Sequence, residues 1–214
     1  KCMKNDRVID ILDEIAKIVI AHEEELTDLD RAIGDGDHGL NLKRGFDAVM
    51  AKVDYFRENE DNMDLSKLLN ETAMTLLSTV GGASGPLYAT ALMKMAKAFR
   101  DKNEGDIDID DIEYAVKEAV EGIKQRGNAS VGDKTMVDTI EPFYAAFKKA
   151  VQEDKNLKNS FAEGLEAAEK GMLSTKDIQA KRGRASYLGE RSIGTVDPGA
   201  RSSYLILKTI YNQI

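Results

Sequence analysis

The sequence predicts an all-α fold, a closed barrel or bundle of eight antiparallel amphipathic helices. Apolar residues recur at steps of three and four along most of the 214 residues, which is the period of a helix with one buried face. No segment shows the strict alternation of apolar and polar residues that is typical of a half-buried strand. Glycine-rich or charged breaks separate the helical segments, and short connections favour antiparallel neighbours.

The first four predicted helices follow from apolar spacing and from their boundaries. They cover residues 4–26, 42–56, 65–76 and 86–100. The charged stretch Arg57 to Asp64 predicts a loop between the second and the third. Ser84 as N-cap and Pro86 in the first turn predict the start of the fourth, because a capping hydroxyl and a proline are both favoured there.

The last four predicted helices cover residues 112–123, 140–151, 161–172 and 204–211. Gly127 to Lys134 forms the break before the second of these. A much longer segment, Thr175 to Ala200, precedes the last one and holds four glycines and three arginines. Loops of this length in compact domains are usually functional or disordered. Because this one also contains Tyr187 and Leu188, we expect an ordered lid.

Composition narrows the class of protein. No linker or repeat divides the chain, so residues 1–214 are expected to form one domain. A net charge of -8, without a basic stripe, argues against nucleic-acid binding. No stretch approaches the ~20 apolar residues of a membrane span. The single cysteine, Cys2, fits a reducing compartment, and the charged first segment does not resemble a signal peptide, so a cytoplasmic protein is expected.

Three aspartates mark the first candidate site. Asp30, Asp35 and Asp37 lie within eight residues, interleaved with glycines, directly before a predicted helix. Carboxylates this close repel one another unless a cation compensates, and hard oxygen ligands favour Mg²⁺ or Ca²⁺. The helix start that follows suits a phosphate. The alternative is a solvated turn in which Asp37 only caps the helix, and the residues alone leave both interpretations open.

The aspartate segment does not form an EF-hand, and the two histidines of the chain, His38 and His22, each have their own interpretation. An EF-hand is excluded, because counting from Asp35 puts Phe46 where a calcium loop needs its Glu. If His38 acts in acid–base chemistry, its neighbouring aspartates are expected to keep it protonated; a purely structural histidine is the alternative. His22, on the polar side of the first predicted helix, is expected at the surface.

Three further breaks are candidates for anion or nucleotide binding. Residues 81–85 form a glycine-rich turn before a helix, whose backbone donors and Ser84 hydroxyl suit phosphate oxygens. Residues 127–136 form another, in which Met136 is suited to lie against a flat ring. The long segment contributes Arg182, Arg184 and Arg191, whose side chains suit a transferring phosphoryl group. Each has an ordinary structural alternative: a common glycine loop, a core methionine and a solvated loop.

Together, four blocks of residues resemble the nucleotide-binding L subunits of dihydroxyacetone kinases. They occur in the family's order and span nearly the whole chain. The blocks are Gly34 to Gly39, Gly81 to Pro86, Gly132 to Met136 and Gly183 to Gly194, the last continuing to Asp197-Pro198-Gly199.

This resemblance implies a barrel of eight helices with ADP at one end. Asp30, Asp35 and Asp37 would bind two Mg²⁺ ions that bridge the nucleotide phosphates. The residues it places at the phosphates are His38, Gly39, Leu40, Asn41, Ala83, Ser84 and Arg184, with Arg182 as the other candidate arginine. It places Gly127 and Met136 beside the adenine. It also implies that the nucleotide is covered by Asp197, Pro198 and Gly199. Arg184 is the expected catalytic residue.

The resemblance also implies partners. A chain that holds only this domain looks like the phosphotransferase-system type, in which tightly bound ADP is rephosphorylated by the phosphohistidine of an M subunit. The resulting ATP then phosphorylates dihydroxyacetone on a K subunit. One alternative is an ATP-dependent kinase domain with exchangeable ATP. Another is a regulatory module that senses the nucleotide state and docks onto a transcriptional regulator.

Overall fold

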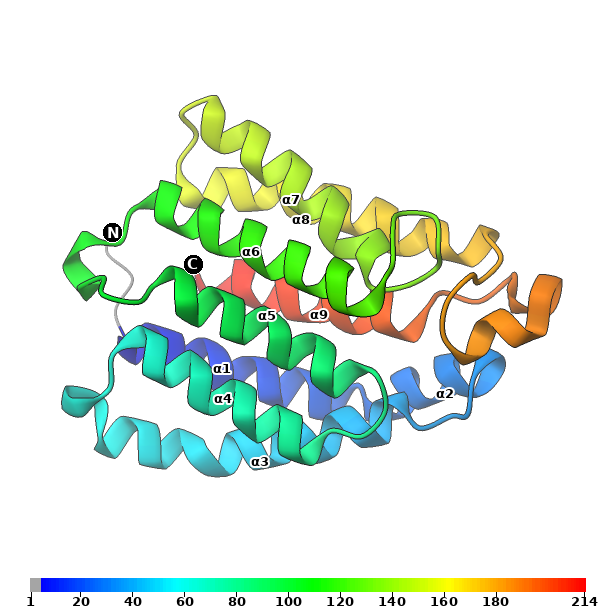
Figure 1. Ribbon diagram of the computed structural model, residues 1–214, viewed down its shortest axis with the longest axis horizontal. Helices are drawn as coiled ribbons and strands as arrows, with labels where there is room; N and C mark the ends of the chain where they lie inside the picture. Colours follow the sequence, from blue (N-terminus) through cyan, green and yellow to red (C-terminus); the bar gives the residue numbers. More distant parts are fainter. Residues whose placement is uncertain (1–4) are drawn as a thin grey trace.

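In the part of the chain that the structure describes, eight long helices lie side by side (Figure 1), and their contacts close them into a ring. The computed structural model describes residues 5–214, without the side chain of Glu104. Contacts run in sequence order from α1 to α3 and on through α9, which packs back against α1. The described α-helices are α1 (Asn5–Ala21), α2 (Glu23–Ile33), α3 (His38–Glu58), α4 (Leu65–Thr79), α5 (Ser84–Ala98), α6 (Ile109–Gly127), α7 (Val137–Gln152), α8 (Leu157–Ser174) and α9 (Pro198–Gln213).

The prediction of an all-α barrel is confirmed. The connections between its helices lie alternately at the two ends of the barrel. Because ring neighbours run antiparallel, every second connection lies at the same end of the barrel (Figure 1). That end gathers α2 and the connections 34–37, 80–83, 128–136 and 175–197. The last of these contains two 3-10 helices, η3 (Thr175–Asp177) and η4 (Arg184–Ser192), so the expected lid is ordered. The opposite end carries η1 (Glu60–Asn62) and η2 (Glu104–Asp106).

The first helix differs from the prediction. One continuous helix was expected over residues 4–26, but Lys4 lies outside the described residues and the chain breaks at His22. The backbone N–H of His22 is shared between the carbonyls of Ile18 (3.1 Å) and Val19 (3.2 Å), and its ring nitrogen lies 2.8 Å from the Ile18 carbonyl. His22 is therefore half-buried at a helix junction, not a plain surface residue. The break starts α2, which crosses the end of the barrel.

The start of α5 also differs in detail. Ser84 was expected as the N-cap, but Ala83 occupies that position and makes no side-chain cap. Ser84 is instead the first helical residue and is buried. Gly81, in the turn before it, lies against Asn41 of α3.

Large apolar side chains of α7 and α8 form one cluster of the core. Phe143 and Phe147 of α7 stack at a centroid distance of 5.7 Å, and Phe161 of α8 meets Phe143 edge-on at 4.7 Å. Gly171 permits the close approach of α8 to α7, because a Cβ there would collide with the Asp138 carbonyl. None of the described helices is both long and apolar enough to cross a membrane.

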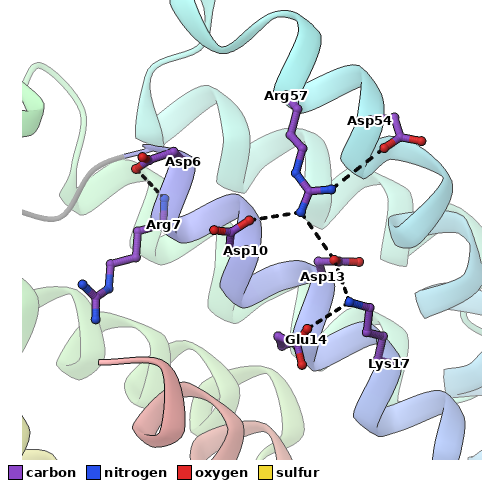
Figure 2. A network of polar contacts seen from close by, with 8 residues as sticks. All are labelled: Asp6, Arg7, Asp10, Asp13, Glu14, Lys17, Asp54 and Arg57. Carbon is purple, nitrogen blue, oxygen red and sulfur yellow. Dashed lines mark hydrogen bonds and ion pairs between the residues drawn. The ribbon is translucent and has the colours of Figure 1, made fainter.

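An exposed ion-pair network joins α1 to α3 (Figure 2). Arg57 lies 3.0 Å from Asp10 and 3.4 Å from Asp13, and Lys17 also reaches Asp13 at 3.0 Å. Exposed pairs such as these contribute little stability each, because water and salt screen them. The buried apolar faces therefore determine the ring.

Truncating the aromatic core should destabilise the whole domain. We expect Phe147→Ala to lower the free energy of unfolding by about 3–5 kcal/mol, since Phe147 is fully buried and its loss leaves a cavity. Urea unfolding followed by circular dichroism measures this. Tyr187→Ala is the control, because Tyr187 is 88% exposed. A loss below about 1 kcal/mol for Phe147→Ala would contradict this account of the core.

Candidate functional site

The three aspartates converge at the junction of α2 and α3. Asp30 lies in the last turn of α2, while Asp35 and Asp37 lie in the turn that follows. One carboxylate oxygen from each lies within 4.8 Å of the other two. Gly34 allows this geometry, because a Cβ there would collide with an Asp30 carboxylate oxygen. Three hard oxygen donors at this spacing fit the requirements of Mg²⁺.

Asp30 also organises the start of α3. Its Oδ2 accepts hydrogen bonds from the backbone N–H groups of Asp37 (2.8 Å) and His38 (3.0 Å). Asp37 occupies the N-cap position but makes no side-chain cap hydrogen bond. The cap that the solvated-turn alternative assigns to the Asp37 side chain is therefore not formed, and Asp30 instead accepts the N–H groups of the N-cap residue and of the first helical residue.

Arg184 reaches the aspartates from the lid. Its Nη1 lies 2.9 Å from Asp35 Oδ2, although 73% of its side chain is exposed. Arg182 points elsewhere and pairs with Asp133 at 3.4 Å. A hollow of about 330 Å³ opens beside the Arg184–Asp35 pair. Its lining residues are Ile33, Gly34, Asp35, Arg184, Tyr187 and Leu188.

Two helix starts meet beside this cluster. Asn41, buried in the first turns of α3, lies against Gly81, where a Cβ would come within 2.9 Å of the Asn41 amide oxygen. Ala83 and Ser84 begin α5 directly after this turn. Gly39 is buried against α2, whereas Leu40 is 50% exposed. Backbone donors at two adjoining helix N-termini suit an anion.

His38 is held in a partly buried polar network. Its Nε2 lies 3.0 Å from Ser202 Oγ of α9, and Ser202 Oγ lies 2.7 Å from the Tyr88 hydroxyl of α5. Burial lowers the pKa of His38 to about 4, against the opposing charge of Asp30. The expectation of a protonated His38 is therefore wrong, because desolvation outweighs attraction to the carboxylate. A neutral imidazole can hydrogen-bond but carries no charge near neutral pH.

The remaining expected residues lie where the lid joins α9. Asp197 caps α9 by accepting the Ala200 N–H at 2.8 Å, and Pro198 and Gly199 form the buried first turn. Met136 packs against Gly199, within 3.6 Å of where a Cβ would lie. Gly127 ends α6 at the base of the same loop. All four sequence blocks thus lie at one end of the barrel.

Burial also perturbs Asp197. The pKa of its carboxyl is raised to about 7, because desolvation outweighs the Ala200 N–H and the charge of Lys134. Asp138 and Asp30 add to the rise. A carboxyl in this position changes its charge close to neutral pH.

Sequence reasoning missed Tyr88, Ser202, Thr175 and Lys134. Lys134 stood within a recognised block, yet its side chain is 1% exposed and bonds two lid carbonyls. Nothing in its spacing distinguishes it from a surface lysine. Tyr88 and Ser202 come from ordinary amphipathic helices and meet His38 only through the closure of the ring.

A match to a family model shows which protein family the chain belongs to. The DAK2 domain model matches residues 32–212. The chain belongs to the DAK2 domain family. Among similar proteins, this DAK2 domain is 40% identical over 195 residues to the "PEP-dependent dihydroxyacetone kinase 1, ADP-binding subunit DhaL" of Listeria innocua, covering 91% of this chain and 89% of the relative. It is 36% identical to the corresponding "ADP-binding subunit DhaL" of Escherichia coli, covering 97% and 96%.

Solved structures support the fold. The dihydroxyacetone kinase of C. freundii in its native form superposes with a TM-score of 0.73 at 20% identity. Its complex with AMP-PNP and Mg²⁺ gives a TM-score of 0.74 at the same identity. Both matches cover all of this DAK2 domain and 35% of the larger kinase chain. At this identity the likeness shows a shared helical fold.

The raised pKa of Asp197 predicts a pH effect on stability. A carboxyl whose folded pKa lies above its unfolded value binds more protons when folded, so stability falls as pH rises from about 4 to about 7. Asp197→Asn keeps an N-cap acceptor for Ala200 but cannot ionise. We expect the variant to gain stability relative to the unsubstituted chain at pH 8 and to gain less at pH 5. Urea unfolding with EDTA present tests this. An equal difference in free energy of unfolding between the variant and the unsubstituted chain at both pH values would contradict it.

Proposed function

We propose that this DAK2 domain is the ADP-binding subunit of a phosphotransferase-system-dependent dihydroxyacetone kinase. The observation that carries the proposal is the aspartate cluster within 4.8 Å, set at the start of α3 and contacted by Arg184. A phosphate group with its cation needs acidic ligands, backbone donors and a basic side chain together. The similarity to ADP-binding DhaL subunits over nearly the full length of both chains supports the same assignment. We further propose that residues 1–214 act as a single domain.

In this proposal each residue has a distinct task. Asp30, Asp35 and Asp37 hold two Mg²⁺ ions, which supply charge neutralisation at the phosphates. The backbone at the start of α3, from His38 through Leu40 to Asn41, contacts the phosphates, together with Ala83 and Ser84 at the start of α5. Gly127 and Met136 lie beside the adenine. Asp197, Pro198 and Gly199 cover the nucleotide from α9.

Arg184 is the proposed catalytic residue. Its guanidinium already lies at the metal-binding aspartates, on a lid whose tip is exposed. Phosphoryl transfer depends on positioning and charge stabilisation more than on a protein nucleophile. Arg184 therefore stabilises the transferring group, while neutral His38 positions the backbone through its bond to Ser202.

The proposed cycle needs two partner subunits. Tightly bound ADP accepts a phosphoryl group from the phosphohistidine of an M subunit, and the resulting γ-phosphoryl passes to dihydroxyacetone on a K subunit. The domain works in the cytoplasm, where these partners lie.

Loss of one aspartate should remove metal-dependent nucleotide binding. We expect the purified chain to release ADP on heating, and Asp35→Asn to retain at least about tenfold less ADP in magnesium, because one charged ligand is lost. Helical content by circular dichroism should stay unchanged. Asp47→Asn is the control, since Asp47 lies on the exposed side of α3 and pairs with Lys43 at 2.6 Å. Equal ADP retention in Asp35→Asn would remove Asp35 from the site.

The phosphoryl donor separates the proposed function from its nearest alternative. With the K and M subunits present, we expect phosphoenolpyruvate and the general phosphotransferase proteins to support turnover, because the nucleotide stays bound throughout. ATP alone should support little turnover, and labelled ATP should exchange slowly with bound ADP. Efficient turnover with ATP and no M subunit would favour the ATP-dependent kinase domain instead.

A further inference from the structure

A buried lysine joins both ends of the lid. Lys134 Nζ donates to the carbonyl of Thr175 (2.6 Å) and to that of Thr195 (2.6 Å), and the side chain is 1% exposed. Thr175 directly follows α8, and Thr195 lies shortly before α9. One ammonium group therefore bonds the chain where the lid leaves the barrel and where it returns.

Further hydrogen bonds join the two ends of the lid, which we call its neck (residues 175–176 and 194–197). The Gly194 N–H donates to the Lys176 carbonyl at 2.7 Å, and the Asp197 N–H donates to Thr175 Oγ1 at 3.0 Å. Within the lid, the Ala180 N–H donates to Ser192 Oγ at 2.9 Å. The lid is thus a closed loop with a hydrogen-bonded neck, and Lys134 lies beneath it.

The loop that carries Lys134 is itself anchored to α7. Asp138, buried in the first turn of α7, accepts the Gly132 N–H at 2.6 Å and the Thr135 N–H at 2.9 Å. Lys134 has a positive φ of 64°, which few non-glycine residues adopt. The Lys181 N–H also donates to the Asp133 carbonyl at 3.0 Å. These hydrogen bonds fix the loop that carries Lys134 and so position its side chain beneath the lid.

A buried ammonium is an expensive way to fill space. An apolar side chain of similar length would fill the same volume without the cost of removing a charge from water. The pKa of Lys134 is lowered by burial, while Asp197, Asp177 and Asp138 counter this by favouring the charged form. Its charge-assisted bonds to two carbonyls of one segment are therefore the feature that needs a reason.

We propose that Lys134 is a positioning residue that clamps the neck of the lid and so sets the rate at which the bound nucleotide leaves. This inference rests on the proposed function. The lid carries Arg184 to the aspartates, and the Lys134 loop carries Met136 to Gly199. One clamp thereby couples the phosphate side of the site to its adenine side.

The first test needs no nucleotide. The lid offers trypsin sites at Lys181, Arg182, Arg184 and Arg191, all within the segment that Lys134 closes. In nucleotide-free protein we expect Lys134→Met to be cleaved there about tenfold faster or more, because it loses both charge-assisted hydrogen bonds and even one of them accounts for a change of that size. Lys124→Met is the matched control, because Lys124 pairs with Glu141 at 2.8 Å between α6 and α7, outside the lid. Equal cleavage of the lid in Lys134→Met and the unsubstituted chain would overturn the clamp.

The second test measures nucleotide release. Displacement of a fluorescent ADP analogue in magnesium should be about tenfold faster or more in Lys134→Met than in Lys124→Met. Phe147→Ala, whose substituted side chain makes none of the hydrogen bonds of the neck, should keep the unsubstituted release rate at a temperature where it is folded, which separates a clamp from general stability. Unchanged release in Lys134→Met would overturn the link to the nucleotide. If the unsubstituted chain binds no ADP, the proposed function fails, while the trypsin experiment still decides whether Lys134 closes the lid.

A measurement on the unsubstituted chain covers the case in which Lys134→Met does not fold. Hydrogen exchange of the Gly194 and Ala180 amides should be at least about a hundredfold slower than in an unstructured peptide, because both are donors within the clamped lid. Exchange of these two amides at the unprotected rate would overturn the proposal.

Discussion

The closure of the helical ring is the constraint on which the site depends. α9 packs against α1, and buried Leu205 joins the apolar cluster that contains Ile15 and Val19. Antiparallel packing around a closed ring brings the connections before α3, α5, α7 and α9 to one end (Figure 1). His38 and Ser202, 164 positions apart in sequence, meet for this reason alone. The polar site is thus built on an apolar constraint.

Negative charge is in excess at the aspartate cluster at that end of the barrel. Three carboxylates face one another, and Arg184 of the lid forms an ion pair with one of them, Asp35. Two adjoining helix starts add donors for an anion. A metal-bound phosphate would satisfy both sets of groups with one ligand, which is the arrangement that the proposed function requires.

Much of the fold and of the candidate site could be predicted from local pattern, and the exceptions share a cause. Apolar periodicity predicted the ring helices, and the glycine-rich blocks are the segments that the structure brings together at one end of the barrel. The break at His22 was missed because apolar residues recur at helical spacing as far as Leu26. The ring nitrogen and the backbone N–H of His22 both contact the Ile18 carbonyl, and the sequence does not reveal this contact. His38 was misjudged because neighbouring aspartates are visible in sequence and burial is not. Lys134 was overlooked for the same reason.

The lid combines a rigid neck with an exposed tip, and this division fits a relay. At the neck, Lys134 is buried and bonds both ends of the loop; at the tip, Tyr187 is 88% exposed beside the hollow next to Asp35. A nucleotide held by the neck can keep its adenine enclosed while its terminal phosphate stays accessible from the tip. Under the proposed function, a phosphoryl group must enter and leave many times while the nucleotide remains. A uniformly mobile lid would release the ADP, and a uniformly buried one would exclude the partner subunits.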